Sequence, residues 1–333
     1  MADVHKQLTE FHDKIKLSDE NEILREKRDK LKENLEEKIS DDAPAIDRYL
    51  LQGSYAIYTG INPPNHDYDI DVGVVFNCTR DDYKPLKLKE MVRDALDHSS
   101  RDPVIKNPCV TVHYRKNGDD AYHVDMPVYV KRTDGIGYDL AWGKSASTEC
   151  WKHSDPDGLI EHINDVSTDA AVRAQYRRIV KYLKFWKSKK FTSFNVPSIG
   201  LTLGVRNDFV PSLGIYDDKP NDLVALRHTL TKMINRFSWV GLDENNNHLY
   251  RWKVGLPVVP YGDVFEKMTD NQMTQLKTKF ESLQNELDKA IAEERCEKAC
   301  EILSRQFDGF PIPPVQQTAR ATVRSMNNTG SSS

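Results

Sequence analysis

The feature that most constrains this chain is a short strand pattern carrying two carboxylates. Over residues 69–76, four apolar residues alternate with two aspartates, a glycine and a valine. This period-2 alternation predicts a β-strand with one apolar face. Asp69 and Asp71 share the other face, about 6–7 Å apart, where like charges repel and are costly to bury. Mg²⁺ is the natural neutralising partner, because it prefers oxygen ligands and retains waters for substrate phosphates.

A third carboxylate lies on a second predicted strand. Residues 109–115 alternate, residues 116–119 give a turn signal, and 122–130 follow as the return strand of a hairpin. Asp125 lies in an apolar part of that return strand, where an unpaired charge would be destabilising. Three carboxylates can hold two magnesium ions about 3.5–4 Å apart, and Asp125 is also a candidate base for an attacking hydroxyl.

A Gly-Ser pair precedes the aspartates and is a candidate phosphate-binding turn. Gly53 lets the backbone approach a phosphate, and the Ser54 hydroxyl can donate a hydrogen bond. A lone Asp-x-Asp is also compatible with a solvent-exposed strand face. The Gly-Ser pair, the strand context and Asp125 together favour a metal site.

Composition excludes several classes of protein. Lys and Arg number 47 against 51 Asp and Glu, a net charge of −4, which disfavours a protein that coats nucleic acid. No Gly-rich dinucleotide fingerprint or Walker A lysine loop is present. Five scattered cysteines without a CxxC spacing disfavour a zinc site, and no stretch reaches the roughly 20 apolar residues of a membrane span. With a charged beginning in place of a signal peptide, these features predict a cytoplasmic protein without a membrane partner.

The order of elements predicts an α+β fold. Residues 3–39 predict two helices with a break near Leu17–Ser18 and a capping pattern from Asp19 to Glu22. A helix is expected over 85–98, and residues 133–166 are expected to form a long loop. Periodic apolar residues or capping signals then predict further helices over 168–190, 197–207, 221–237, 269–290 and 292–307. We therefore expect N-terminal helices and a sheet lobe over 1–165, a helical lobe over 166–310 and a disordered tail over 311–333.

These residues resemble a known family. Gln52-Gly53-Ser54, then alternating aspartates, then a later strand with Asp125, is similar to the pattern of polymerase-β-like nucleotidyltransferases. Residues 179–186, 191–194 and 154–156 resemble the helical half of the CD-NTases, the bacterial cyclic-oligonucleotide synthases related to cyclic GMP–AMP synthase and oligoadenylate synthase. The resemblance covers roughly 40–310 and implies a nucleotidyltransferase sheet lobe followed by an oligoadenylate-synthase-like helical lobe.

The resemblance also implies roles for individual residues. Asp69, Asp71 and Asp125 would bind two Mg²⁺ ions, with Mn²⁺ as an alternative metal. The residues implied to bind the nucleotide are Gln52, Gly53, Ser54, Lys181, Lys184, Ser193 and Phe194. Lys181 would reach the phosphates and Phe194 would stack on a base, whereas a solvated helix face and core packing are the respective alternatives. Tyr58 departs from the family pattern, which has a glycine there, so the acceptor side is expected to differ.

The implied activity is Mg²⁺-dependent joining of nucleoside triphosphates, ATP among them, into a cyclic di- or trinucleotide with release of pyrophosphate. In the family this product serves anti-phage signalling of the CBASS type. The alternative is a template-independent nucleotidyltransferase acting on RNA or protein, and the acidic net charge weighs against an RNA acceptor. No stable nucleic-acid partner is expected. The tail after residue 310 is a candidate contact for a regulatory or conjugating protein.

Overall fold

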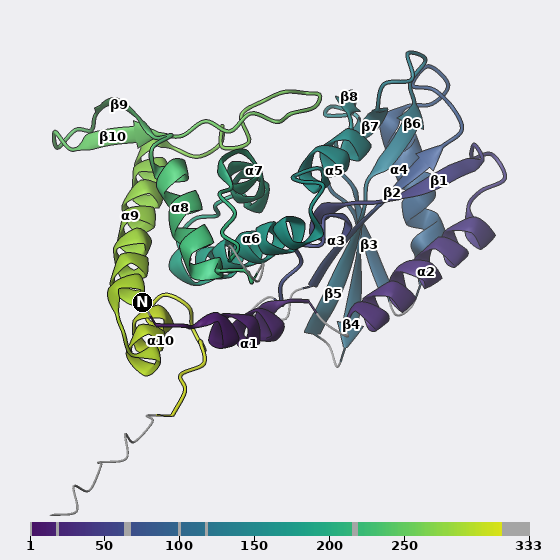
Figure 1. Cartoon of the computed structure of the whole chain (residues 1–333). Coiled ribbons are helices and arrows are strands. Elements are labelled where there is room, and N and C mark those ends of the chain that lie inside the picture. The colour runs from purple at the N-terminus through teal and green to yellow at the C-terminus, as the bar shows by residue number, and fades with distance from the viewer. Residues whose placement is uncertain are drawn as a thin grey trace, which may run out of the picture.

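An eight-stranded mixed sheet forms one half of the protein, whose computed structural model describes residues 2–17, 20–62, 68–98, 101–116, 119–214 and 219–314 (Figure 1). Its strands are β1 (Ile46–Leu51), β2 (Tyr68–Phe76), β3 (Arg101–Ile105), β4 (Val110–Lys116), β5 (Asp119–Met126), β6 (Val128–Lys131), β7 (Tyr138–Trp142) and β8 (Cys150–Ser154). The order is β3-β4-β5-β2-β6-β7-β8, with β1 also paired to β2. β2 runs parallel to both β5 and β6 and antiparallel to β1, so it lies in the middle of the sheet.

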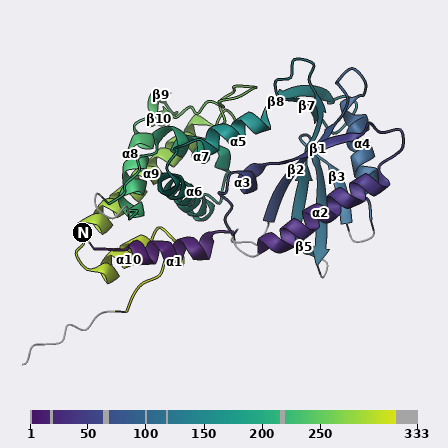
Figure 2. The same ribbon diagram turned by 45° about the vertical axis from the view of Figure 1, so that its right-hand side comes forward.

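The predicted apolar face of β2 is buried under two helices. Ile70, Val72, Val74 and Phe76 are each at most 1% exposed. α2 (Glu20–Lys38) and α4 (Pro85–Leu96) share the same hydrophobic cluster, to which α2 contributes Leu31 and Leu35. Figure 2 shows α2 lying across this side of the sheet. The opposite face, which carries Asp71, is therefore the face left for chemistry.

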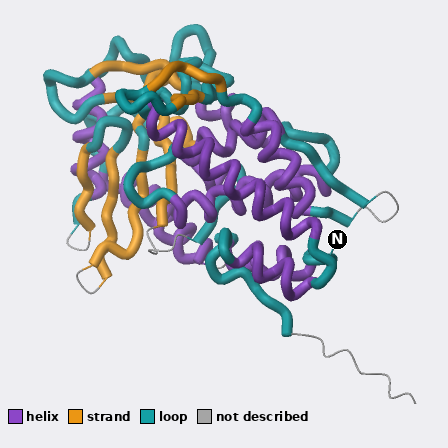
Figure 3. Tube along the Cα trace, turned by 90° about the vertical axis from the view of Figure 1, so that its left-hand side faces the viewer, coloured by secondary structure: helices purple, strands orange, loops and turns teal. Residues whose placement is uncertain are grey.

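The other half of the protein is helical, and Figure 3 shows it as a separate layer beside the strands. Its helices are α1 (His5–Ile15), α5 (Pro156–Asn164), α6 (Ala170–Lys190), α7 (Ser198–Asp208), α8 (Asp222–Ile234), α9 (Asp270–Ala292) and α10 (Cys296–Ser304). α6 lies at the centre, because Tyr176, Ile179, Leu183 and Trp186 along it are each at most 1% exposed. Short α3 (Gly53–Ala56) lies between α6 and the sheet (Figure 1).

Several predicted elements are confirmed. α1 and α2 are separate helices, α6 spans the predicted 168–190 segment, and Thr269 and Gln272 form the predicted capping box of α9. The apolar face of α1 packs in the helical half, where Phe11 contacts the rings of Tyr182 and Phe185. The lobe boundary at residue 165 stays a prediction, and α1, which precedes it in the chain, packs into the core of the helical half. The Asp19 cap and the tail beyond residue 314 lie outside the described residues.

The structure corrects the predicted loop over 133–166, which contains β7, β8 and α5. Each of these strands has only five residues, too few for a clear alternation. The α5 helix begins at Pro156, and the Asp155 carboxylate caps it by accepting from the Gly158 amide at 2.9 Å.

Two further differences concern strands. The predicted return strand 122–130 is divided into β5 and β6 at Pro127, whose carbonyl accepts from the Val74 amide of β2. Proline has no amide hydrogen for a sheet ladder, so it interrupts the strand. Sequence reasoning also missed β1, β3 and a hairpin of β9 (Ser238–Leu242) and β10 (His248–Arg251) in the helical half.

Candidate active site

Strand register brings the predicted carboxylates together. In the parallel pairing of β2 with β5, Asp71 lies directly beside Asp125, and the backbone of Asp69 lies beside His123. Adjacent strands lie about 4.8 Å apart, so Asp71 and Asp125 share one site. The Thr111 hydroxyl of β4 donates to Oδ1 of Asp125 at 2.5 Å and orients that carboxylate. The side chain of Asp69 lies outside the described part of the protein.

The Gly-Ser turn lies against Asp71. Gly53 has a φ of +62°, a left-handed conformation that favours glycine, and a Cβ at this position would overlap the Asp71 carboxylate. The backbone amide of Gln52 donates to the backbone carbonyl of Asp71 at 3.0 Å, which joins the turn to β2. The close approach of Gly53 therefore leaves backbone, with no side chain, beside the carboxylate.

A cavity of about 290 Å³ opens next to this turn. Its lining residues are Gly53, Ser54, Ile57, Thr59, Asp71, Leu159, Ile160, Ile163, Lys184, Ser198, Ile199 and Thr202. One wall is apolar and comes from α5 and α7, whereas the remainder carries hydroxyls, one ammonium and one carboxylate. We refer to this space as the Asp71 cavity.

Lys184 provides the ammonium of the Asp71 cavity. Its side chain is 8% exposed, and Nζ donates to the Thr59 carbonyl at 2.8 Å. Thr59 is fully buried, and its hydroxyl has no hydrogen-bond partner among the described atoms. A buried hydroxyl usually has a partner, so its position in the lining of this cavity indicates a place for a polar ligand.

Lys181, one helical turn before Lys184, faces a different space. It lines a cavity of about 160 Å³ on the other side of Ser54, together with Arg25, Tyr55 and Tyr58. Its ammonium lies 3.4 Å from Nε2 of His12 on α1. Burial, and then the nearby cations, lower the pKa of Lys181 to about 8. The structure thus separates the two predicted phosphate lysines, and it is Lys184 that lies on the Asp71 side.

Three other predicted nucleotide-binding residues lie away from the lining of both cavities. The side-chain amide of Gln52 is buried and donates a hydrogen bond to the Tyr129 hydroxyl. Ser193 is exposed, and Phe194 packs on Phe191 with ring centroids 5.3 Å apart. Core packing of Phe194, the alternative considered from the sequence, agrees with this placement.

Sequence reasoning missed most of the cavity wall. Leu159, Ile160 and Ile163 belong to α5, within the region expected to be a loop. Ser198 and Thr202 lie one turn apart at the start of α7 and line the same cavity, and the Thr202 hydroxyl donates to the Ser198 carbonyl. The only available signal was the position of Ser198 at the predicted helix start, which a plain cap explains equally well.

Tyr58, the departure from the family pattern, has a left-handed backbone with a φ of 58°. Non-glycine residues rarely adopt this conformation. Its ring is 61% exposed and lies 4.4 Å from the Arg177 guanidinium carbon. This position thus has a backbone conformation that glycine favours, but it carries an aromatic ring beside the cavity that Lys181 lines.

The described side chains are compatible with a magnesium site. Asp71 and Asp125 supply hard oxygen ligands in register, and Asp69 follows two residues before Asp71 on the same strand. Among the side chains that are described, no group of three His, Cys, Asp or Glu residues forms a metal cluster. A three-carboxylate site therefore depends on the side chain of Asp69.

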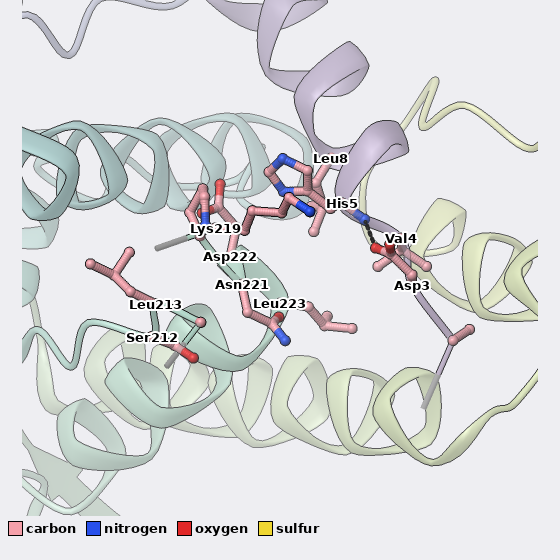
Figure 4. Close-up of a pocket in the computed structure, with 13 residues that line it drawn as sticks. Asp3, Val4, His5, Leu8, Ser212, Leu213, Lys219, Asn221, Asp222 and Leu223 are labelled. Carbon is pink, nitrogen blue, oxygen red and sulfur yellow. Dashed lines mark hydrogen bonds between the residues drawn. The ribbon is translucent and has the colours of Figure 1, made fainter. Parts of the chain in front are cut away.

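A further cavity, of about 340 Å³, lies beside the first described residues of the chain and apart from these carboxylates (Figure 4). It is bordered by residues 2–5, by Leu8 and by the segments around Leu213 and Asn221. Figure 4 shows the His5 backbone amide directed to the Asp3 carboxylate, a bond of 2.9 Å. Asp222, at its wall, is already bonded to Arg178 and Tyr182.

A central Asp-x-Asp strand, an aspartate beside it and a Gly-Ser turn against them define the polymerase-β-like nucleotidyltransferase fold. Residues 47–129 match the family model for the nucleotidyltransferase domain of DncV-like cyclic GMP-AMP synthases. A cyclic GMP-AMP synthase of Escherichia albertii is 29% identical over 190 residues, which is 53% of this chain and 40% of that relative. The match thus spans less than half the length of this curated relative.

Solved structures share the fold. The chain aligns with Vibrio cholerae DncV cyclic AMP-GMP synthase at a TM-score of 0.66 and 16% identity, over 93% of this chain and 97% of the other. The 3'-deoxy GTP bound form of Escherichia coli DncV aligns at a TM-score of 0.61 and 17% identity, over 89% of this chain and 93% of the other. The chain therefore has the DncV fold, and its residues 47–129 are similar to the nucleotidyltransferase domain of DncV-like synthases. No helix within the described residues is long and apolar enough to cross a membrane.

Proposed function

We propose that this protein joins nucleoside triphosphates, ATP among them, into a cyclic di- or trinucleotide and releases pyrophosphate. The observation that carries the proposal is the register of Asp71 beside Asp125, with Gly53 and Lys184 on the Asp71 side. Relatives named as cyclic GMP-AMP synthases support the same reaction class. The reaction forms a phosphodiester bond between a ribose hydroxyl and the α-phosphate of a second nucleotide, and it breaks the bond to the β-phosphate.

In this proposal the donor triphosphate occupies the Asp71 cavity. The Lys184 ammonium and the hydroxyls of Ser54 and Ser198 supply positive charge and hydrogen-bond donors for its phosphate oxygens. The apolar residues of α5 exclude water from this side, which strengthens each electrostatic contact. Lys181 remains a candidate for a second phosphate contact across Ser54.

Asp69, Asp71 and Asp125 would hold the magnesium ions. When bound, such ions activate the attacking hydroxyl and stabilise charge on the leaving pyrophosphate. Asp125 receives the proton of the attacking hydroxyl, and the hydrogen bond from Thr111 keeps its carboxylate in place. Asp71 lies between Asp125 and Gly53, so its carboxylate faces the reacting phosphate from the donor side.

The experiment is incubation of the purified protein with all four nucleoside triphosphates and Mg²⁺, without an acceptor. The products are treated with phosphatase and identified by mass spectrometry. We expect phosphatase-resistant cyclic products from the wild type and none from Asp125→Asn. Asp134→Asn is the matched control, because this carboxylate pairs with Arg132 in an exposed loop.

Different outcomes separate the alternatives. Label incorporated into added RNA or into protein, without cyclic product, would favour transfer to a macromolecule. Cyclic product from Asp125→Asn at the wild-type rate would refute the carboxylate assignment. We further propose that the cyclic product acts in bacterial anti-phage signalling inside the cytoplasm, which predicts that phage protection of host cells is lost with the same variant.

A further inference from the structure

The proposed reaction requires a second nucleotide, the acceptor, next to the donor. Resting on the proposed function, we propose that His113 and His123 form the acceptor subsite and that their rings stack against the acceptor base. The argument uses the strand register around the carboxylates, the direction of the reaction across the sheet and the chemistry of the two rings.

Two adjacent rows of residues cross the three strands β2, β5 and β4. One row consists of Asp71, Asp125 and Thr111, and the next row consists of Asp69, His123 and His113. Side chains two residues apart on a strand share a face, so the histidines project from the same face as the carboxylates. His123 lies about 6.6 Å along the strand from Asp125, a separation that a ribose can span between its hydroxyl and its base.

The direction of the reaction assigns the two sides of the site. Gly53 and the Asp71 cavity lie on the β1 side of β2, and Asp125 lies on the β5 side. In a displacement at phosphorus, the attacking oxygen and the leaving oxygen are roughly in line on opposite sides. With the leaving pyrophosphate beside Gly53, the attacking hydroxyl approaches from Asp125. The remainder of the acceptor then lies over β5 and β4.

The rings on β5 and β4 suit a nucleobase. The centroids of His113 and His123 are 5.9 Å apart with planes inclined at 33°, and both side chains are half-buried. Aromatic side chains, histidine among them, hold bases by stacking, and this contact tolerates any base. The opposite face of these strands is occupied by core residues such as Val112 and Val124, so the two histidines lie on the sheet face that carries the carboxylates.

The test separates donor from acceptor by their chemistry. A dideoxynucleoside triphosphate has no attacking hydroxyl and serves only as donor. A nucleoside triphosphate with a methylene α,β-bridge serves only as acceptor. Formation of the linear dinucleotide is measured while each is varied in turn, for the wild type, His113→Ala, His123→Ala and the corresponding phenylalanine variants.

We expect each alanine variant to raise the half-saturating acceptor concentration about tenfold and to leave that of the donor within about twofold. The phenylalanine variants, which retain a stacking ring, should recover most of this loss. His248→Ala, in the distant β10 hairpin, is the matched control. Unchanged acceptor dependence in both alanine variants, or an equal change for donor and acceptor, would overturn the inference. A wild type that forms no dinucleotide at all would instead refute the proposed function, and with it the inference.

Discussion

Gly53 lies so close to Asp71 that the Cβ of any other residue would overlap the Asp71 carboxylate. Gly53→Ala should therefore displace a proposed metal ligand as well as strain a backbone with a φ of +62°. We expect an activity loss of about 10²-fold or more, since metal contacts contribute several kcal/mol to catalysis. The rate of nucleotide synthesis measures the effect on Asp71, and the thermal unfolding temperature measures the effect of the backbone strain.

Gly135→Ala is the control for this experiment, because Gly135 has a φ of +69° and open space around its Cβ position. It imposes a similar backbone strain, about 1 kcal/mol, without a contact to the site. Equal activity in the two variants would mean that the close approach of Gly53 to Asp71 has no role in the reaction.

Thr111→Val should reduce activity more than stability. The substitution removes the hydrogen bond to Asp125 while keeping the volume of a fully buried side chain. Loss of such a supporting contact typically reduces activity or metal affinity about 10- to 100-fold. Thr229→Val removes a comparable buried hydroxyl, which accepts from the Val210 amide in the helical half. The Thr229→Val variant should be less stable but keep its specific activity. A similar loss of specific activity in Thr229→Val and Thr111→Val would contradict the proposed role of Thr111.

Lys184→Met and Lys181→Met distinguish the two lysines of α6. We expect Lys184→Met to weaken binding of a nonhydrolysable nucleoside triphosphate about 10- to 100-fold, since a charge-assisted hydrogen bond contributes about 1.5–3 kcal/mol. Lys181→Met should have a smaller effect, because Lys181 lies in the neighbouring cavity. Titration calorimetry at constant pH measures both. A larger effect of Lys181→Met would contradict this assignment and would indicate that the donor phosphates bind in the cavity that Lys181 lines.

His12 should make stability depend on pH. Burial, and then the charge of Lys181, lower its pKa from 6.5 to about 4. Because the unfolded chain binds a proton between these values and the folded protein does not, the stabilisation is present above pH 6.5 and is lost as the pH falls toward 4. Relative to His12→Gln, the wild type should lose about 1–3 kcal/mol more unfolding free energy between pH 7 and pH 4.5.

Urea unfolding at a series of pH values measures this difference. His248→Gln serves as the control, since its ring lies in the hairpin of β9 and β10, away from α1. A parallel pH dependence in the wild type and His12→Gln would contradict the proposed burial of a neutral His12.

The sequence predicts those elements whose pattern is long and local. α6 and α9 have five or more apolar positions at helical spacing, and β2 alternates over its whole length. β7 and β8 are too short for this signal and depend on pairing with each other and with β6. Pro127 is visible in the sequence, but the division of the strand at this residue is not. That division depends on the pairing of both β5 and β6 with β2.

The site was predictable to a similar extent. The residue types at Gly53, Asp71 and Asp125 predicted the candidate site, and the structure brings these three residues together. Positions three apart on a helix differ by about 60° in direction, which is too little to separate Lys181 from Lys184 in a sequence pattern. In the folded protein Lys184 is bonded to the Thr59 carbonyl and lines the Asp71 cavity, whereas Lys181 lines the cavity beside Tyr58 and Gly60.

The bond from Lys184 to the Thr59 carbonyl fixes this ammonium to the main chain in the absence of any nucleotide. A lysine on a free surface loses rotamer freedom when it first grips an anion. Here that entropy is already lost when the chain folds. A triphosphate therefore meets a preorganised cation, and its affinity is not reduced by the ordering of this side chain.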